Sequence, residues 1–440
     1  MTETTHFRPA LHFTPQRNWM NDPNGLILHK GVYHLFFQHN PHGRRWGNIG
    51  WGHAISTDLA TWEELPVAIP PSEHEMAFSG SAVWDRHNTS GLGEGEGPLV
   101  AIFTSAYTDA DPQRPGQQAQ SLAYSLDDGA TWTRYAGNPV LERGSECFRD
   151  PKVFWHEPTQ RWVMVAVEAD HRQLLIHSSA DLLEWRFESA FGPVGEEGIQ
   201  WECPDLLEVP LESGGSRWVL LLSTNPGGFS GGSGMRYFVG DFDGSVFTPA
   251  GDAPRWLDHG PDFYAAVSFH GTSEPTVVGW MSNWVYANET PTEPWQSAMT
   301  VARRLSLVER DGGLVLRHEL LLPAELPEGV TVFDGVLAPS ESLEVRTGQG
   351  DQVSACVIRR QDDGSLVVDR RGADPHGTHA QLPATPPIPL PEGPVDIRVI
   401  EDHGLLEIFL DGGIVAVTVQ TFPHEGSVEI VEAGSVVAVG

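Results

Sequence analysis

Cysteine is scarce in this 440-residue chain. The three cysteines, Cys147, Cys203 and Cys356, lie far apart, and no two of them form a CxxC pair. An odd number of widely separated cysteines excludes a disulfide framework and a thiolate zinc site. We therefore expect a hydrophobic core to stabilise the fold, and 40% hydrophobic residues over this length are enough for two domains.

Basic residues are also few. The chain has 27 lysines and arginines against 59 aspartates and glutamates, and its formal net charge at pH 7 is −32. Such a charge repels polyphosphates and argues against nucleic acid as a partner. A neutral sugar meets no such repulsion, and the 15 tryptophans offer apolar faces for sugar rings, although tryptophan is equally ordinary in a core.

Long hydrophobic runs are missing. No stretch of 18 apolar residues occurs, and the first ten residues, MTETTHFRPA, have neither the basic nor the apolar region of a signal peptide. We therefore expect no membrane partner and a cytoplasmic location for the chain as written. A secreted protein that has lost its leader would look the same, and the sequence carries no signature of an oligomeric state.

Helical periodicity is rare, and short apolar runs recur between glycine, proline, aspartate and asparagine turns. This pattern is typical of short strands and predicts an all-β fold. The clearest runs are residues 32–37, 99–104, 162–167 and 218–222.

An internal repeat predicts how these strands are organised. An aspartate is followed four residues later by an aromatic residue at four places, roughly 50 to 70 residues apart, and a fifth unit fits before about residue 320. Each interval is long enough for a four-stranded blade, so residues 1–322 are predicted to form a five-bladed β-propeller. The alternative is that this aspartate-to-aromatic spacing belongs to a common hairpin turn and recurs here by chance. The four pairs are Asp58/Trp62, Asp128/Trp132, Asp181/Trp185 and Asp243/Phe247.

The composition changes after the fifth unit. Residues 323–329 are punctuated by proline and glycine and suit a linker. Short alternating strands follow within residues 330–440, on both sides of a proline-rich loop at 382–394, and predict a β-sandwich. No acidic motif stands out in this second domain, so we interpret it as a packing module that stiffens the first.

Three acidic motifs stand out in the first domain: WMNDPNG at residues 19–25, FRDP at 148–151 and ECPD at 202–205. Asp22 and Asp150 directly precede proline, which biases the backbone before it toward an extended conformation. Asp22, Asp150 and Glu202 all come a similar distance before the repeated aspartate of their own unit. A similar distance from the repeat predicts that the three acids occupy a similar place in their blades. If that place is the innermost strand, the acids converge at the centre of the propeller.

Converging carboxyl groups suit glycoside hydrolysis, which needs one acid on each side of the scissile bond. Like charges in one cleft raise at least one pKa, so that one acid can stay protonated near neutral pH. We expect Arg149 to keep Asp150 ionised and suited to binding sugar hydroxyls. An isolated acid of this kind is more often an Asx-turn or an ion pair. A calcium site is a further alternative, but no D-x-D-x-D loop accompanies the acids.

The three motifs, in this order, resemble the signature blocks of glycoside hydrolase family 32, the β-fructofuranosidases that include invertases, exo-inulinases and levanases. The resemblance continues through residues 51–58, 78–81, 234–244, 262–265 and 279–284, and reaches weakly into residues 395–423. It implies a five-bladed propeller followed by a sandwich, with Asp22 as nucleophile, Glu202 as general acid/base and Asp150 as transition-state stabiliser.

The resemblance also implies a pocket for the terminal fructose and requires no metal or cofactor. Cys203 has no catalytic partner motif and is expected to serve packing. Trp46 and Trp280 are expected to form walls of the sugar pocket, and the rival interpretation is that they pack in the core. The residues implied to line the pocket are Asn21, Gln38, Trp46, Phe78, Ser79, Arg149 and Trp280.

The function predicted from the sequence is a retaining, exo-acting β-fructofuranosidase acting on fructans, fructo-oligosaccharides and sucrose. Residues 279–295 and 232–244 look more like exo-levanases and exo-inulinases than like invertases. The missing signal peptide instead favours short imported oligosaccharides. Sucrose-6-phosphate would need converging basic groups, and the only basic cluster near the motifs is Arg44-Arg45, which could equally belong to a solvated loop.

Three alternatives stay open. A fructosyltransferase would pass the same covalent intermediate to a sugar hydroxyl instead of water. A non-catalytic carbohydrate-binding propeller would have lost an acid, whereas here all three are present. An inverting, arabinan-type hydrolase on a similar propeller would use no covalent intermediate.

Overall fold

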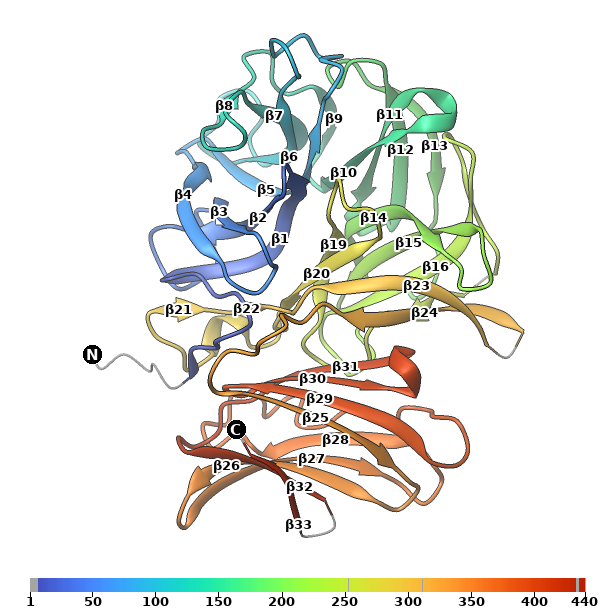
Figure 1. Ribbon diagram of the computed structural model, residues 1–440. Coiled ribbons are helices and arrows are strands. Elements are labelled where there is room, and N and C mark those ends of the chain that lie inside the picture. Colours follow the sequence, from blue (N-terminus) through green and yellow to red (C-terminus); the bar gives the residue numbers. More distant parts are fainter. Residues whose placement is uncertain (1–6, 252, 311, 433–434, 440) are drawn as a thin grey trace.

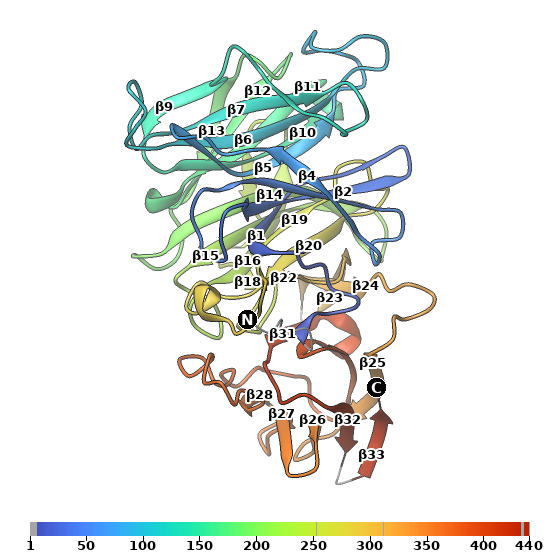
Figure 2. The ribbon, with the colours of Figure 1, turned by 90° about the vertical axis from the view of Figure 1, so that its left-hand side faces the viewer.

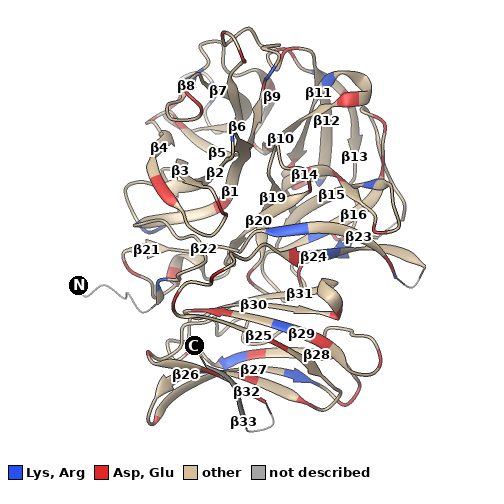
Figure 3. Ribbon diagram, viewed as in Figure 1, with Lys and Arg blue, Asp and Glu red and all other residues tan. Residues whose placement is uncertain are grey.

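The computed structural model describes residues 7–251, 253–310, 312–432 and 435–439. These residues form strands, turns and a few short 3₁₀ helices, which confirms the predicted all-β class. Two β domains follow each other along the chain and pack together (Figure 1). Acidic residues are spread over both domains (Figure 3). No helix in the described ranges is long and apolar enough to cross a membrane.

Five sheets occupy residues 18–320, and neighbouring strands are antiparallel except for β1 and β21. The first sheet contains β1 (Asn18–His29), β2 (Val32–Asn40), β3 (Gly50–Ser56), β4 (Glu63–Ile69) and β21 (Trp295–Gln296). The second contains β5 (Glu75–Trp84), β6 (Leu99–Tyr107), β7 (Gln118–Ser125), β8 (Thr133–Arg134) and β9 (Leu141–Ser145). The third contains β10 (Phe148–His156), β11 (Arg161–Glu168), β12 (Gln173–Ser179) and β13 (Arg186–Phe191). The fourth contains β14 (Gln200–Pro210), β15 (Ser216–Asn225), β16 (Gly234–Phe242), β17 (Phe247–Pro249) and β18 (Arg255–Trp256). The fifth contains β19 (Tyr264–Ser268), β20 (Thr276–Met281), β22 (Ala298–Met299), β23 (Arg303–Arg310) and β24 (Gly313–Leu320).

The first strands of these sheets form a closed ring. β1 contacts β5, β5 contacts β10, β10 contacts β14, β14 contacts β19, and β19 contacts β1 (Figures 1 and 2). The short parallel pairing of β21 with β1 joins the end of the domain to its beginning. We infer that each sheet is one blade of a propeller, with its first strand innermost.

Alternate residues of one strand pack against different neighbouring sheets. In β11, Trp162 and Met164 belong to a core cluster with side chains of the second sheet, whereas Val163 and Val165 belong to a cluster with side chains of the fourth. Because both faces of the sheet are covered, both sets of side chains are apolar. This explains why the run at residues 162–167 is continuously hydrophobic instead of alternating.

The repeated aspartates lie in the turns between the third and fourth strands of their sheets. Asp58, Asp181 and Asp243 each accept hydrogen bonds from the backbone N–H groups two and three residues further along. In the second sheet the place is taken by Asp127, whose carboxylate accepts a backbone N–H four residues on at 2.9 Å. Asp128, the repeated aspartate of this unit, lies in the same turn, but its carboxylate contacts His29 and Lys30 instead.

The second domain is a pair of packed sheets. One has the order β25-β29-β30-β31 and the other β28-β27-β26-β32-β33. Their inner faces share one hydrophobic core, to which Ile358, Val399 and Ile430 contribute fully buried side chains. Residues 321–329, between β24 and β25, contain the predicted linker. The strands are β25 (Val330–Leu337), β26 (Ser342–Gln349), β27 (Gln352–Arg360), β28 (Leu366–Gly372), β29 (Val395–Asp402), β30 (Leu405–Leu410), β31 (Val415–Gln420), β32 (Ser427–Glu432) and β33 (Ser435–Val439).

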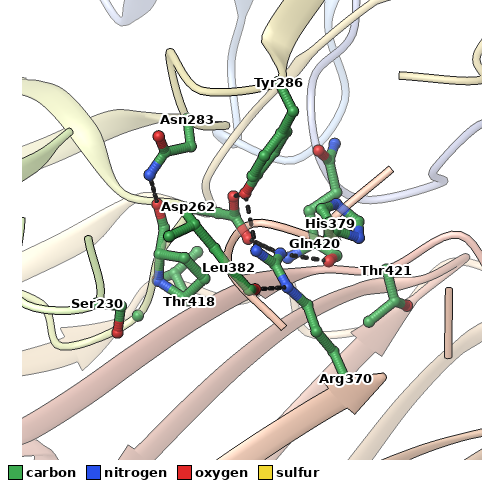
Figure 4. A network of polar contacts seen from close by, with 12 residues as sticks. Ser230, Asp262, Asn283, Tyr286, Arg370, His379, Leu382, Thr418, Gln420 and Thr421 are labelled. Carbon is green, nitrogen blue, oxygen red and sulfur yellow. Dashed lines mark hydrogen bonds and ion pairs between the residues drawn. The ribbon is translucent and has the colours of Figure 1, made fainter. Parts of the chain in front are cut away.

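A buried polar network joins the two domains (Figure 4). Arg370 of the sandwich donates a hydrogen bond to Asp262 of the first domain at 2.6 Å, and the backbone N–H of Gln420 donates to the same carboxylate at 2.7 Å. The hydroxyl of Tyr286 also donates to Asp262. The ion pair between Arg370 and Asp262 is costly to break, because either side chain alone would be an uncompensated buried charge.

A second buried cluster ties the start of the chain to the sandwich. Arg303 contacts Asp258 at 2.9 Å and also pairs with Glu407. His12 lies between Asp402 and Glu407, with nitrogen-to-oxygen distances of 2.8 and 3.0 Å. Burial alone would lower the pKa of His12, but hydrogen bonds to the two carboxylates outweigh burial and raise this pKa to about 9. His12 is therefore expected to be positively charged at neutral pH.

Candidate active site

The three predicted acids lie on the first strands of three sheets. Asp22 is in β1, Asp150 is in β10 and Glu202 is in β14. This is the shared position that their common phase in the repeat predicted. The structure brings all three to the wall of one cavity of about 420 Å³.

A β-bulge occurs at this place in the first strand of every sheet. A bulge bends its strand and re-aims the side chains next to it, and bulges are common beside active sites. Asp150 and Cys203 adopt left-handed backbone conformations within their bulges, with φ of 62° and 44°. The register shifts fall between Met20 and Pro23, Ala77 and Gly80, Arg149 and Lys152, Glu202 and Asp205, and Tyr264 and Val267.

Nine of the ten predicted site residues line the cavity. Gln118, Asn225 and Trp284 also line it, although none of them was predicted. Gln118 begins β7 and Asn225 ends β15, so each comes from a strand outside the innermost ring. The predicted residues at the cavity are Asn21, Asp22, Gln38, Trp46, Phe78, Ser79, Arg149, Asp150 and Glu202.

Trp280 does not line the cavity, and its prediction as a wall of the pocket was wrong. Its side chain is fully buried, and it packs against Trp19, Tyr264 and Trp284 with ring centroids 4.9 to 6.3 Å apart. Trp284, four residues later, lies at the cavity instead. Trp280 lies within β20, whereas Trp284 follows that strand in a loop. The rival interpretation of Trp280 as a core residue is the one that the structure supports.

Asp22 is held by three neighbouring side chains. Ser79 donates a hydrogen bond to one carboxylate oxygen at 2.6 Å, and Asn21 donates to the other at 3.0 Å. The thiol of Cys203 lies 3.3 Å from the oxygen that Ser79 contacts. Burial raises the pKa of Asp22, and the hydrogen bond from Ser79 opposes this rise. The carboxylate is thus fixed in orientation while its other surface faces the cavity.

Two side chains, one cationic and one neutral, donate hydrogen bonds to Glu202. Arg149 donates to one of its oxygens at 3.1 Å, and the hydroxyl of Tyr264 donates to the other. Burial raises the pKa of Tyr264 well above its ordinary value, so this hydroxyl keeps its proton and remains a donor. Tyr264 was not predicted as a site residue. It lies beside the bulge of the fifth sheet, as the acids do in theirs, but the fifth unit has no repeated aspartate from which its phase could have been measured.

Asp150 shares its neighbouring arginine with Glu202. Arg149 lies 3.9 Å from Asp150 and closer to Glu202, so it is shared between two carboxyl groups. Burial raises the pKa of Asp150 to about 7, although Arg149 opposes the rise. Arg149 therefore favours the ionised form of Asp150, as its position in the sequence suggested, but it does not cancel the effect of burial on this pKa. The backbone N–H of Cys203 donates to Asp150 at 2.9 Å, which links β10 to β14.

The remaining lining residues surround the acids with amide and aromatic groups. Gln38 donates to the side chain of Asn24 at 2.5 Å and to a backbone carbonyl at 3.1 Å, so its position is fixed. Trp46 is 44% exposed and lies with its ring 6.0 Å from that of Phe78. A cavity with polar groups around its acids and aromatic rings beside them suits a small, hydroxyl-rich ligand.

Two family models together match most of the chain. The N-terminal domain of glycosyl hydrolases family 32 matches residues 12–318, and the C-terminal domain of the same family matches residues 335–438. The chain belongs to glycoside hydrolase family 32. The resemblance seen in the three sequence motifs is thereby confirmed.

Members of this family with assigned activities are similar over long stretches. The extracellular exo-inulinase of Aspergillus awamori is 50% identical over an alignment of 333 positions, which covers 68% of this chain and 62% of that protein. The levanase of Bacillus subtilis is 41% identical over an alignment of 468 positions, gaps included, which covers 96% of this chain and 67% of that protein. A β-fructofuranosidase from Schwanniomyces occidentalis, solved with fructosyl-erythritol, superposes with a TM-score of 0.89 at 32% identity, covering 100% of this chain and 97% of that one.

Proposed function

We propose that this family 32 protein is a retaining, exo-acting β-fructofuranosidase that hydrolyses terminal β-D-fructofuranosyl residues of fructans, fructo-oligosaccharides and sucrose. The observation that carries the proposal is the convergence of Asp22, Asp150 and Glu202, from three separate strands, on one cavity. The exo-inulinase and levanase similarities support the fructan substrate.

Asp22 is the proposed nucleophile. Its carboxylate attacks the anomeric carbon of the terminal fructose and forms a covalent fructosyl ester, while the bond to the leaving oxygen breaks. The hydrogen bonds from Ser79 and Asn21 aim the attacking carboxylate and limit its basicity. Cys203 stays a neutral thiol because burial raises its pKa, so it does not compete as a nucleophile.

Glu202 is the proposed general acid/base. In the first step it gives its proton to the leaving oxygen, and in the second it removes a proton from the water that attacks the fructosyl ester. Tyr264 and Arg149 hold its two oxygens, so that the carboxyl group is oriented in both steps. As the water oxygen bonds to the anomeric carbon, the ester bond to Asp22 breaks, which leaves Asp22 as a free carboxylate and Glu202 protonated for the next cycle.

Asp150 is proposed to bind hydroxyl groups of the fructose ring and to stabilise the transition state. In its ionised form it can only accept hydrogen bonds, and the hydroxyls of a sugar are donors for it. Because its pKa is raised to about 7, this form requires a neutral or alkaline solution or the approach of a substrate hydroxyl. Asn21 and Gln38 supply further hydrogen bonds, and Trp46 and Trp284 supply apolar walls.

Sucrose-6-phosphate is disfavoured as the substrate. Arg149 is the only cationic side chain at the cavity among the described residues, and it already contacts Glu202. The two arginines near the first motif are also engaged: Arg44 donates to the backbone of Thr292, and Arg45 pairs with Glu289 at 3.0 Å. Among the described residues, therefore, no set of unpaired basic side chains converges on the cavity to bind a phosphate group.

The nucleophile assignment is tested with Asp22→Asn. We expect fructose release from sucrose to fall by several orders of magnitude while the circular dichroism spectrum stays unchanged. Asp109→Asn, at an exposed position outside the cavity, is the matched control and should keep full activity. Normal turnover by Asp22→Asn would overturn the assignment.

The reaction type and substrate need separate measurements. NMR of the first-formed sugar should show retained anomeric configuration, and inversion would exclude the covalent route. At high sucrose concentration, trisaccharides exceeding free fructose would show a transferase instead of a hydrolase. Fructose release compared among levan, inulin, sucrose and sucrose-6-phosphate tests the proposed preference for fructan ends.

A further inference from the structure

A second cavity lies where the innermost strands end, away from the acids. It has a volume of about 330 Å³. Three innermost strands, β1, β5 and β10, reach both cavities. The first half of each strand contributes a residue to the catalytic cavity, and its last or second-last residue lines the second cavity. Along β1, the six steps from Asp22 to Leu28 correspond to roughly 20 Å of extended chain. The second cavity therefore opens at the opposite end of the ring.

Three tryptophan side chains line the second cavity. Trp84 comes from β5, Trp155 from β10 and Trp162 from β11. Their indole N–H groups are already hydrogen-bonded to the backbone of Glu96, to the carboxylate of Glu157 and to a threonine hydroxyl, respectively. With the polar edges satisfied, the rings have only apolar faces left to offer a ligand. Trp84 and Trp155 are both partly exposed.

The polar groups at this cavity can exchange hydrogen bonds with sugar hydroxyls. Two cationic side chains also line it, but Lys30 already pairs with Asp128 and Glu96, and Arg86 is exposed to solvent. No carboxylate is among its lining residues, in contrast to the three at the catalytic cavity. The ring nitrogens of His270 have no hydrogen-bond partner within the described part of the chain. Burial lowers the pKa of His270 to about 4, so the neutral imidazole offers one donor and one acceptor. His87 and Arg86 lie at the exposed rim.

We propose that this cavity is a second, non-catalytic carbohydrate-binding site that holds a distant segment of the fructan chain. Apolar ring faces beside a neutral imidazole match the alternating apolar and hydroxyl surfaces of a sugar ring. The volume lies at the lower end of the range for small-molecule sites, so it suits roughly one or two sugar rings. Without carboxyl groups the site binds but does not hydrolyse. The choice of fructan as ligand rests on the proposed function.

Calorimetric titration of the Asp22→Asn protein with a fructo-oligosaccharide tests the second site directly. We expect two binding sites per chain in this protein and one in Asp22→Asn/Trp155→Ala. A one-site titration of Asp22→Asn would overturn the proposal, as would two sites remaining after the loss of Trp155. If Trp155→Ala does not fold, the exposed pair Arg86→Ala/His87→Ala replaces it and should weaken the second site about tenfold; unchanged binding would overturn the proposal.

Kinetics in the otherwise unchanged enzyme give an independent readout. Trp155→Ala should raise the KM for polymeric levan or inulin several-fold and leave kcat/KM for sucrose unchanged, because sucrose is too short to reach both cavities. Trp185→Ala, a partly buried tryptophan outside both cavities, is the control for loss of an indole ring. Failure of the proposed function would appear as no fructose release by the parent enzyme. Failure of the second site alone would appear as equal KM values in an enzyme that does release fructose.

Discussion

Replacing His12 with glutamine should remove much of the pH dependence of stability between pH 6.5 and 9. His12 lies fully buried between Asp402 and Glu407, and Arg303 contacts the same Glu407. The two carboxylates favour the charged imidazolium and raise the pKa of His12 from 6.5 to about 9. In the unfolded chain these contacts are absent and the pKa returns to its ordinary value.

The sign and size of the effect follow from this difference. A group whose pKa is higher in the folded state contributes stability that is fully present below the unfolded pKa and is lost as the pH rises through the folded pKa. Each pKa unit corresponds to about 1.4 kcal/mol, so the rise from 6.5 to about 9 gives His12 a contribution of about 3 kcal/mol. This contribution is complete below pH 6.5 and absent well above pH 9.

Urea denaturation at several pH values between 6 and 10, followed by tryptophan fluorescence, measures this contribution. The difference in unfolding free energy between the wild-type protein and His12→Gln should shrink by about 3 kcal/mol across the range. His171→Gln changes an exposed histidine in the short helix η3 (Ala169–His171) and should show no such trend. A difference for His12→Gln that stays constant with pH would refute the reasoning.

Three further outcomes test the catalytic cavity. Glu202→Gln should lower kcat for sucrose by roughly a hundredfold to ten-thousandfold, and much less for a fructoside with a strongly acidic leaving group, as steady-state kinetics would show. Arg149→Met removes a cation that lowers the pKa of Asp150, so the acid limb of the pH–activity profile should move to higher pH. Trp280→Ala should cost about 3–5 kcal/mol in urea denaturation because it empties a buried site, whereas Trp284→Ala should mainly raise KM.

The positions of the acids could be predicted from the sequence because the repeat sets a phase. Asp58 and Asp181 mark the turn between the third and fourth strands of their sheets, and a fixed distance before such a turn is a fixed place in the first strand. The same logic places Asp22, Asp150 and Glu202 on equivalent strands. A local turn signal thus carried information about residues that meet only in the folded protein.

The other residues of the cavity could not be predicted from the repeat. Gln118 and Asn225 come from outer strands, so no phase relation to the acids identifies them. Trp280 and Trp284 have the same side chain and are four residues apart, and which one faces the cavity depends on where β20 ends. The charge of Asp150 depends on its burial and on its distance from Arg149, and sequence adjacency specifies neither.

The bulges explain how one ring of strands can provide a complete site. In a regular strand, side chains alternate between faces, and consecutive residues cannot both point into a central cavity. A bulge places an extra residue there and breaks the alternation, so that Asn21 and Asp22, or Phe78 and Ser79, line the cavity as neighbours. Tyr264 extends the same arrangement to the fifth sheet, where its hydroxyl contacts Glu202. Each of the five sheets therefore contributes a polar side chain to the acids or their partners, and the geometry of the site depends on closure of the whole ring.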